Sequence, residues 1–372
     1  MSSPGDPGGP EPAESLSALS RRSRILVCCG PGGVGKTTVA AALAVHGAEE
    51  GRRSVVVTVD PARRLADALG LDALPDTPQS IEGDWPGELS ALMLDSKSTF
   101  DSLVTKYAPK PEQAEAILAN PFYRNIAGAL SGTQEYMAME KLYELSTDDR
   151  FDLIVVDTPP TRNALDFVDA PRRLTRFLDN RIFRLLMLPT RVGIKAVNVA
   201  AQTFLRTISR VVGGDVVTDA VAFFQAFEGM ENGFRDRAQR VLDLLAEPAT
   251  AFVVVSSPRR DAVAEAEFFA SKLGEAGIPV QGLVLNRMQP RFVTGWTPEA
   301  DRERARTLAG TALGQLWQNL ADLHALADAE EAQVEGIIRR VAPAPTARVP
   351  LLESDVHDLG GLAAVGRHVL GD

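Results

Sequence analysis

The segment that most constrains the fold runs from Gly30 to Thr38, GPGGVGKTT, directly after the apolar run ILVCC at residues 25–29. One glycine, four residues and then Gly-Lys-Thr is the spacing of a phosphate-binding loop. Glycines let successive backbone N–H groups face a phosphate, because a side chain would block that approach. The following residues to Glu49 are Ala-rich and predict a helix whose N-terminus attracts anions. Strand, loop and helix in this order therefore predict a polyphosphate site.

The residue types of this loop predict separate roles. The Lys36 ammonium suits the β- and γ-phosphates, and the Thr37 hydroxyl suits Mg²⁺. The residues expected to bind the nucleotide are Gly30, Gly32, Gly33, Val34, Gly35, Lys36, Thr37 and Thr38.

Composition narrows the class of protein. The chain has 372 residues, 45% of them hydrophobic, which favours one large α/β domain with insertions. A net charge of −10 argues against a broad nucleic-acid surface, so no nucleic acid is expected as a partner. The two cysteines are adjacent in a predicted strand, where they point to opposite faces and favour neither a disulfide nor a shared metal. With no run long enough for a membrane helix, we expect a soluble, cytoplasmic protein.

Residues 1–22 are rich in Pro, Gly and Ser and predict a disordered tail, followed by a folded domain over 23–372. Further strands are predicted at 54–59, 90–94, 151–157, 251–256 and 280–285. The long apolar strands are typical of a mostly parallel, doubly wound α/β sheet that is covered on both faces.

Two of these strands end in carboxylates, at the edge of the sheet where ligands bind. Asp60 follows the strand at 54–59 and would orient water or, alternatively, cap the next helix. Asp157 ends the strand at 151–157 and would hold Mg²⁺ or its water shell. The loop at 158–163 is expected to respond to the γ-phosphate, and its Arg162 would touch phosphate, touch a partner subunit or be solvated.

Two apolar stretches leave alternatives open. Met137 and Met139 would pack in the core, which we favour, or form a recognition face. A helical subdomain at about 171–250 contains many apolar residues with interleaved Arg and Lys between Phe183 and Val212. This stretch would cover the sheet, or bind an apolar helix or a membrane.

The last third of the chain carries the expected base site. Asn286 follows the strand at 280–285, where its amide would hydrogen-bond a base edge. Residues 288–306 predict a polar loop, helical patterns continue to about Val341, and Pro350 opens a further apolar segment.

Together these landmarks resemble the ArsA-type ATPases, the family of the arsenite-pump ATPase and of the eukaryotic ATPase that targets tail-anchored membrane proteins. Residues 131–137, SGTQEYM, are most similar to the ArsA-like ATPases that occur as paired paralogues in high-GC Gram-positive bacteria. The motifs that carry the resemblance are residues 32–38, 59–62, 157–161, 285–287 and 350–352.

The resemblance implies a P-loop NTPase fold with an inserted helical subdomain, and ATP hydrolysis that depends on Mg²⁺. It implies that Asp60 positions the attacking water, that Lys36 binds phosphate, and that Thr37 and Asp157 serve Mg²⁺. Asn286 and Pro350 would flank the adenine, and the helical region would take an apolar or membrane-protein client or a partner. Two other functions stay open, a chaperone-like binder of apolar helices that uses ATP as a switch, and a ParA/MinD-type positioning ATPase.

One departure from the family pattern concerns the oligomer. Members usually carry a lysine directly after the first loop glycine, which reaches the nucleotide of the other subunit, but this chain has Pro31 there. We therefore expect a hetero-oligomer with an ArsA-like paralogue that donates the lysine, with a homodimer as the alternative. The zinc-binding cysteine pair and the arsenite-binding cysteine trio of relatives are also missing, so zinc-clamped dimerisation and arsenite transport are not expected.

Overall fold

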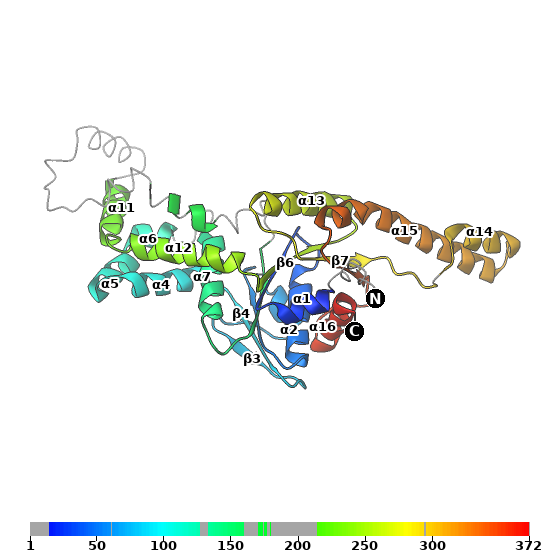
Figure 1. Ribbon diagram of the computed structural model, residues 1–372, viewed down its shortest axis with the longest axis horizontal. Coiled ribbons are helices and arrows are strands. Elements are labelled where there is room, and N and C mark those ends of the chain that lie inside the picture. Colours follow the sequence, from blue (N-terminus) through cyan, green and yellow to red (C-terminus); the bar gives the residue numbers. More distant parts are fainter. Residues whose placement is uncertain are drawn as a thin grey trace, which may run out of the picture. The chain divides into compact units, whose positions relative to one another are not determined.

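The computed structural model describes residues 15–60, 62–126, 133–159, 170–173, 175–176, 179, 214–293 and 295–371 (Figure 1). Contacts divide the chain into two compact units. The sheet unit comprises residues 1–93, 149–164 and 248–372, and the helical unit comprises 94–148 and 165–247. The sequence places a helical subdomain at about 171–250, whereas the helical unit also includes residues 94–148.

The sheet unit is built on eight strands in the order β3-β4-β2-β5-β1-β6-β7-β8. All neighbouring strands are parallel except β3 and β4. This is the mostly parallel α/β sheet of a P-loop NTPase, as the sequence predicts. The strands are β1 Ile25–Cys29, β2 Arg53–Thr58, β3 Gln79–Ile81, β4 Glu88–Met93, β5 Leu153–Asp157, β6 Thr250–Ser256, β7 Gly282–Met288 and β8 Thr346–Pro350.

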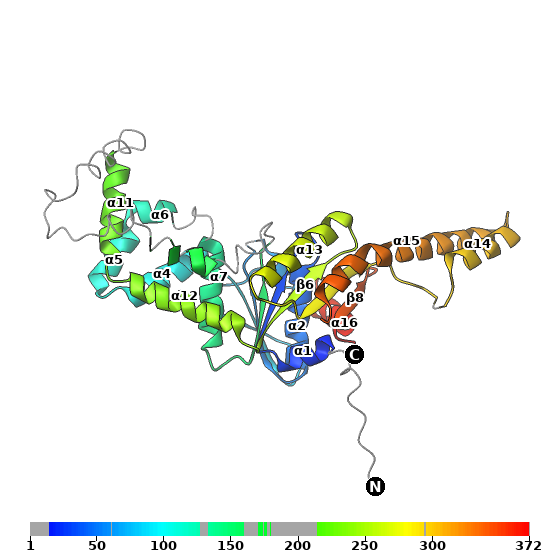
Figure 2. The same cartoon turned by 45° about the horizontal axis from the view of Figure 1, so that its top comes forward.

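Helices cover both faces of this sheet. Figures 1 and 2 show α13 and α15 on one side and α1, α2 and α16 on the other. The central strands β1, β5 and β6 are buried along their whole length, because both of their faces are covered. Cys28 and Cys29 are buried and unpaired in β1. The helices of the unit are α1 Leu16–Arg22, α2 Lys36–Glu49, α3 Arg64–Ala68, α13 Arg260–Glu275, α14 Pro298–Thr307, α15 Ala312–Val341 and α16 Leu359–Leu370.

The helical unit has its own core of aromatic side chains. The Tyr123 and Phe223 rings stack with centroids 5.9 Å apart, and Phe227 and Phe234 lie 5.1 Å apart. Met137 and Met139 are fully buried, so the core-packing interpretation of these residues is confirmed. The described helices are α4 Ser96–Tyr107, α5 Pro111–Ala119, α6 Pro121–Ile126, α7 Thr133–Ser146, α11 Gly214–Ala226 and α12 Glu231–Ala246.

A buried ion pair also belongs to this unit. Arg237 of α12 donates to Glu140 of α7 at 2.6 Å, and Tyr136 donates to the other oxygen of the same carboxylate at 2.5 Å. The Arg237 guanidinium also lies 3.6 Å from the centre of the Tyr143 ring. Because each charged group is satisfied, the pair fixes how α7 and α12 pack.

The structure differs from the sequence-based expectation at residues 16–22. Composition assigns these residues to a disordered tail, but they form α1, capped by the Ser15 hydroxyl, which accepts from the Ala18 N–H at 3.1 Å. Leu16 and Leu19 are buried in the core that includes α2 and α16. Two leucines on one face are enough to pack this short helix on the core. The average composition of residues 1–22 does not reveal them, because Pro, Gly and Ser dominate it.

A second difference concerns the polar loop expected at 288–306. Residues 298–307 form α14, which begins with Thr297 as N-cap and Pro298 at its first position. The helix carries many charged side chains and little apolar character, so periodicity does not reveal it. The Thr-Pro start signal does, since threonine caps and proline fits the first turn.

Candidate functional site

The phosphate-binding loop lies between β1 and α2. Strand β1 is in the middle of the sheet, with β5 on one side and β6 on the other, and ligands of such sheets bind at the carboxyl ends of the central strands. At two positions of the loop only glycine fits, because neighbouring atoms leave no room for a Cβ. Gly30 has φ +138, and a Cβ there would lie 2.2 Å from the carbonyl oxygen of Val255. Gly35 has φ +90, and a Cβ there would lie 2.2 Å from the Asn286 amide nitrogen. A side chain at either position would push the loop off β6 or β7.

Lys36 begins α2 and is buried despite its charge. Its ammonium donates to the carbonyl oxygen of Pro31 at 2.8 Å, which holds the side chain along the inside of the loop. Burial lowers the pKa of Lys36, while the charge of Asp157 opposes that effect. An ammonium has three N–H donors, so donors remain for phosphate oxygens.

Asp157 at the end of β5 is fully buried, and one of its oxygens accepts two hydroxyl bonds. Thr37 of the loop donates to Oδ2 at 2.7 Å, and Thr58 of β2 donates to the same oxygen at 2.8 Å. Burial raises the pKa of Asp157 to about 6, although these two bonds and the Lys36 charge lower it. Oδ1 is buried and has no hydrogen-bond partner among the residues that the structure describes.

This arrangement fits a divalent cation. Mg²⁺ prefers carboxylate and hydroxyl oxygens, and it relieves the cost of a buried carboxylate whose second oxygen lacks a partner. The Thr37 hydroxyl and the Asp157 carboxylate are in direct contact, so both could serve one ion.

Asp60 follows β2 and lies on the same edge of the sheet. Its Oδ1 accepts from the Ala62 N–H at 2.9 Å, and its Oδ2 pairs with Arg64 at 3.1 Å. Asp60 thus holds the turn before α3 and does not cap the helix itself, because the N-cap residue of α3 is Arg63 and has no side-chain cap bond. The charge of Asp60 also acts on the pKa values of Lys36 and Asp157, so this carboxylate lies near the site.

Thr58 connects the two acids and was not among the residues predicted from the sequence. Its hydroxyl accepts from the Asp60 N–H at 3.2 Å and donates to Asp157 at 2.8 Å. The Thr58 hydroxyl therefore links the Asp157 carboxylate to the backbone of Asp60. A hydroxyl residue directly before the acid-bearing turn is the sequence signal that points to this link.

Asn286 and Arg287 hold the loop from β7. The Asn286 amide donates to the carbonyl oxygen of Val34 at 2.8 Å and accepts from the Arg287 N–H at 3.0 Å. Arg287 has φ 61, the left-handed conformation, at an irregularity in the pairing of β7 with β8. Its guanidinium donates to the carbonyl oxygen of Gly33 at 3.3 Å. Arg287 belongs to the motif at 285–287 that the sequence singled out, but its contact with the loop was not predicted, because that contact depends on the backbone conformation.

Pro350 and Glu265 complete the surroundings of the site. Pro350 ends β8 opposite Met288, and the Leu351 N–H donates to the Met288 carbonyl oxygen at 2.8 Å. Pro350 therefore lies one strand beyond Asn286, at the same end of the sheet. Glu265 of α13 was not predicted, but its charge weakly opposes the lowering of the Lys36 pKa by burial, so this carboxylate lies near the loop.

Several predicted residues fall outside the described part of the chain. They are Arg162 with the rest of the loop at 160–163, and the apolar stretch from Phe183 to Val212. Within the residues that the structure describes, no helix is both long enough and apolar enough to cross a membrane.

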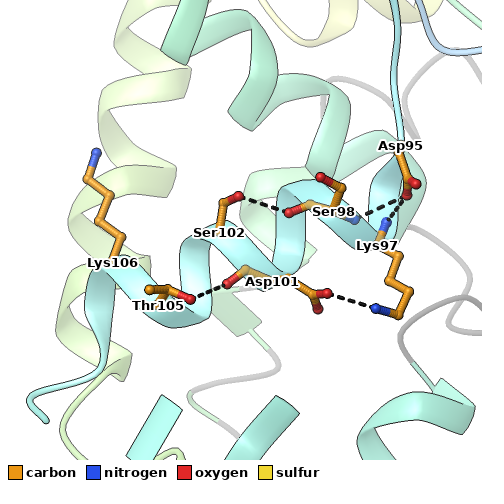
Figure 3. A pocket seen from close by; sticks show the side chains of 7 residues that line it. All are labelled: Asp95, Lys97, Ser98, Asp101, Ser102, Thr105 and Lys106. Atoms are coloured by element: carbon orange, nitrogen blue, oxygen red, sulfur yellow. Dashed lines mark hydrogen bonds and ion pairs between the residues drawn. The ribbon is translucent and has the colours of Figure 1, made fainter. Parts of the chain in front are cut away.

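Hollows are also present outside the loop itself. An apolar cavity of about 100 Å³ lies behind α3, lined among others by Thr58, Leu65 and Met93. A more open hollow of about 540 Å³ runs along α4 of the helical unit (Figure 3). Its polar side chains are engaged in bonds within the protein, as Lys97 donates to Asp101 at 2.7 Å and Tyr123 of α6 donates to the same carboxylate.

Comparison with known proteins adds independent findings. The family described as "Anion-transporting ATPase" matches residues 23–305. An uncharacterized protein of Streptomyces coelicolor is 30% identical over 314 residues, 82% of this chain and 71% of that protein. The "ATPase GET3" of Malassezia globosa is 24% identical over 75% of this chain and 77% of its own length. The "ATPase GET3C" of Arabidopsis thaliana is 26% identical over 75% of this chain and 70% of its own length.

Proposed function

The chain belongs to the anion-transporting ATPase family, whose activity is ATP hydrolysis, and we propose that Mg²⁺-dependent hydrolysis switches it between two states of an assembly with an ArsA-like paralogue. The observation that carries the proposal is the bonded series from Thr37 through Asp157 and Thr58 to Asp60. This series runs from the phosphate-binding loop to the turn that precedes α3. Nucleotide binding at the loop would thus alter the hydrogen bonds of Asp60 in the turn before α3.

The chain's own residues supply binding and orientation. The N–H groups of the loop and the Lys36 ammonium would bind phosphate oxygens, while Thr37 and Asp157 would hold Mg²⁺. When bound, Mg²⁺ neutralises charge on the phosphates. The Asp60 carboxylate, which is mostly buried and lies close to Lys36, would orient the water that attacks the γ-phosphate. Positioning and electrostatic stabilisation, rather than covalent chemistry, would provide most of the rate.

The conformational part of the proposal concerns α3. This helix has only five residues and begins four residues after Asp60. The cavity of about 100 Å³ behind it provides room for the helix to shift without overpacking the core. We expect α3 to move when the bonds of Asp60 are rearranged on nucleotide binding.

The partner is inferred from Pro31. Proline has no cation to offer a second nucleotide, and its carbonyl oxygen instead accepts from the chain's own Lys36. A symmetric pair of these chains would lack the cross-subunit charge at both sites. An ArsA-like paralogue that carries the lysine would complete one composite site. A client for the helical unit also belongs to the proposal, and its support is the apolar sequence between Phe183 and Val212.

The test is steady-state ATP hydrolysis by the purified chain, alone and titrated with its paralogue from the same genome. We expect activity to rise to a plateau at equal amounts of the two chains. The matched control pairs the paralogue with Lys36→Ala, which should remove the activity that depends on this chain's loop. A rate that is unchanged by the paralogue would contradict the composite site.

A further inference from the structure

The two antiparallel helices between β7 and β8, α14 and the first half of α15, form a hairpin with a defined inner face. His324 of α15 and Asp301 of α14 are both buried, with Nδ1 and Oδ2 2.7 Å apart. The Trp296 and Trp317 rings stack at 5.0 Å, and the Arg304 guanidinium lies 3.9 Å from the Trp296 ring. These contacts fix the hairpin internally, so it does not depend on its outer face.

Leucines occupy another face of α15. Leu313, Leu316, Leu320 and Leu323 follow one another at spacings of three, four and three residues. Leu313 is 52% exposed and Leu316 63% exposed, while Leu320 and Leu323 are half-buried. These four residues, called the leucine seam here, lie about a quarter turn from the face that packs on α14. The C-terminal half of α15 packs instead on α13, where Arg340 donates to Ser271.

The spacing of the leucine seam indicates the kind of partner. Alternating steps of three and four residues form the seam of helices that pack as knobs into holes. A second helix is therefore the partner that fits, rather than a sheet, a loop or a small molecule.

Charge indicates which helix. Between Leu313 and Ala327 the only Asp, Glu, Lys or Arg is Asp322, although the whole chain carries a net charge of −10. The seam therefore offers no charge that would select an oppositely charged partner, and it avoids the repulsion that two copies would meet elsewhere. An apolar, uncharged seam is complementary to itself, as a twofold interface requires.

We propose that the leucine seam joins two copies of this chain, so that two α14–α15 hairpins form a four-helix bundle. This contact is separate from the nucleotide site, because it involves neither the phosphate-binding loop nor Asp60. It is independent of ATP and leaves each copy free to meet a paralogue.

The first experiment measures mass by sedimentation from about 1 to 100 µM, the range expected for a small interface, with and without MgATP. We expect a reversible dimer under both conditions. The double variant Leu313→Glu/Leu316→Glu should weaken it at least about tenfold. Phe268→Glu on α13 is the matched control, since Phe268 is 50% exposed and lies outside the seam, and it should leave the dimer intact.

The second experiment identifies the occupant. Leu316→Cys introduces an exposed thiol into a chain whose Cys28 and Cys29 are both buried. A short bismaleimide should then crosslink two copies of this variant, but not two copies of the Phe268→Cys control. A wild-type chain that stays monomeric, a dimer unaffected by the double variant, or a crosslink that forms only with the paralogue would each overturn the proposal. Loss of the composite ATPase would leave these masses unchanged, so the two proposals fail separately.

Discussion

Replacement of the buried carboxylate by Asp157→Asn gives the most quantitative prediction. Burial raises the pKa of Asp157 from 3.8 to about 6, so the folded protein holds a proton that the unfolded chain releases near pH 4. Stability falls with rising pH wherever the folded state binds more protons. The ionised Asp157 therefore destabilises the metal-free fold, and this cost develops between about pH 4 and pH 7.

The magnitude follows from the pKa difference. A difference of about two pH units corresponds to about 3 kcal/mol at 1.36 kcal/mol per unit. The asparagine amide resembles the protonated acid in shape and does not titrate. Its oxygen can still accept from Thr37 and Thr58. Any difference in the free energy of unfolding that does not come from the titration of Asp157 should therefore be the same at all pH values.

The pH dependence of stability is measured by urea denaturation in the presence of EDTA, with tryptophan fluorescence as the signal, from pH 4 to pH 7.5. The free energy of unfolding of Asp157→Asn minus that of the wild type should rise by about 2 to 3 kcal/mol across this range. MgATP should reverse part of the trend by stabilising the wild type alone. A difference that stays flat with pH would refute the account of the buried, unpartnered carboxylate.

Three further substitutions address the other residues of the site. Lys36→Ala should abolish stabilisation by MgATP, which for the wild type amounts to about 2.7 kcal/mol at a ligand concentration 100 times Kd; an undiminished melting shift would count against the loop assignment. Asp60→Asn keeps the acceptor for the Ala62 N–H and should bind ATP but lose hydrolysis, and unchanged turnover would leave Asp60 with only a structural role in the turn before α3. Arg287→Gly removes the guanidinium while permitting φ 61, so it should weaken ATP binding without lowering stability, and it should gain up to about 1 kcal/mol from relief of backbone strain. Calorimetric titration of that variant with MgATP checks the first effect, and an unchanged Kd would show that the bond to Gly33 is dispensable.

The sequence was sufficient for features that depend on local pattern. Parallel strands buried on both faces read as continuous apolar runs, so β1, β2, β4, β5, β6 and β7 all appear near their predicted positions. The phosphate-binding loop is a local motif, and its glycines are needed because a side chain would block the approach of phosphate or of neighbouring residues. Asp157 could be placed beside the loop because parallel strands bring their carboxyl ends to one edge.

Features that depend on contacts between distant residues could not be predicted. The bond from Asn286 to Val34 spans 252 residues, and the turn of Arg287 onto Gly33 depends on an irregularity at the end of β7. Helix α1 is stable because Leu16 and Leu19 reach the core, not because of its composition. The pairing of α14 with α15 rests on contacts such as Asp301 with His324, which neither helix shows alone.

Pro31→Lys tests the central claim most directly, because it adds the missing charge while keeping the backbone carbonyl that accepts from Lys36. The measurement is ATP hydrolysis by this variant and by the wild type, each with and without the paralogue. We predict that the variant alone hydrolyses ATP at the rate that the wild type reaches only in the mixture. Full activity of the wild type alone, or a variant that still depends wholly on the paralogue, would contradict the account of a site that a partner completes.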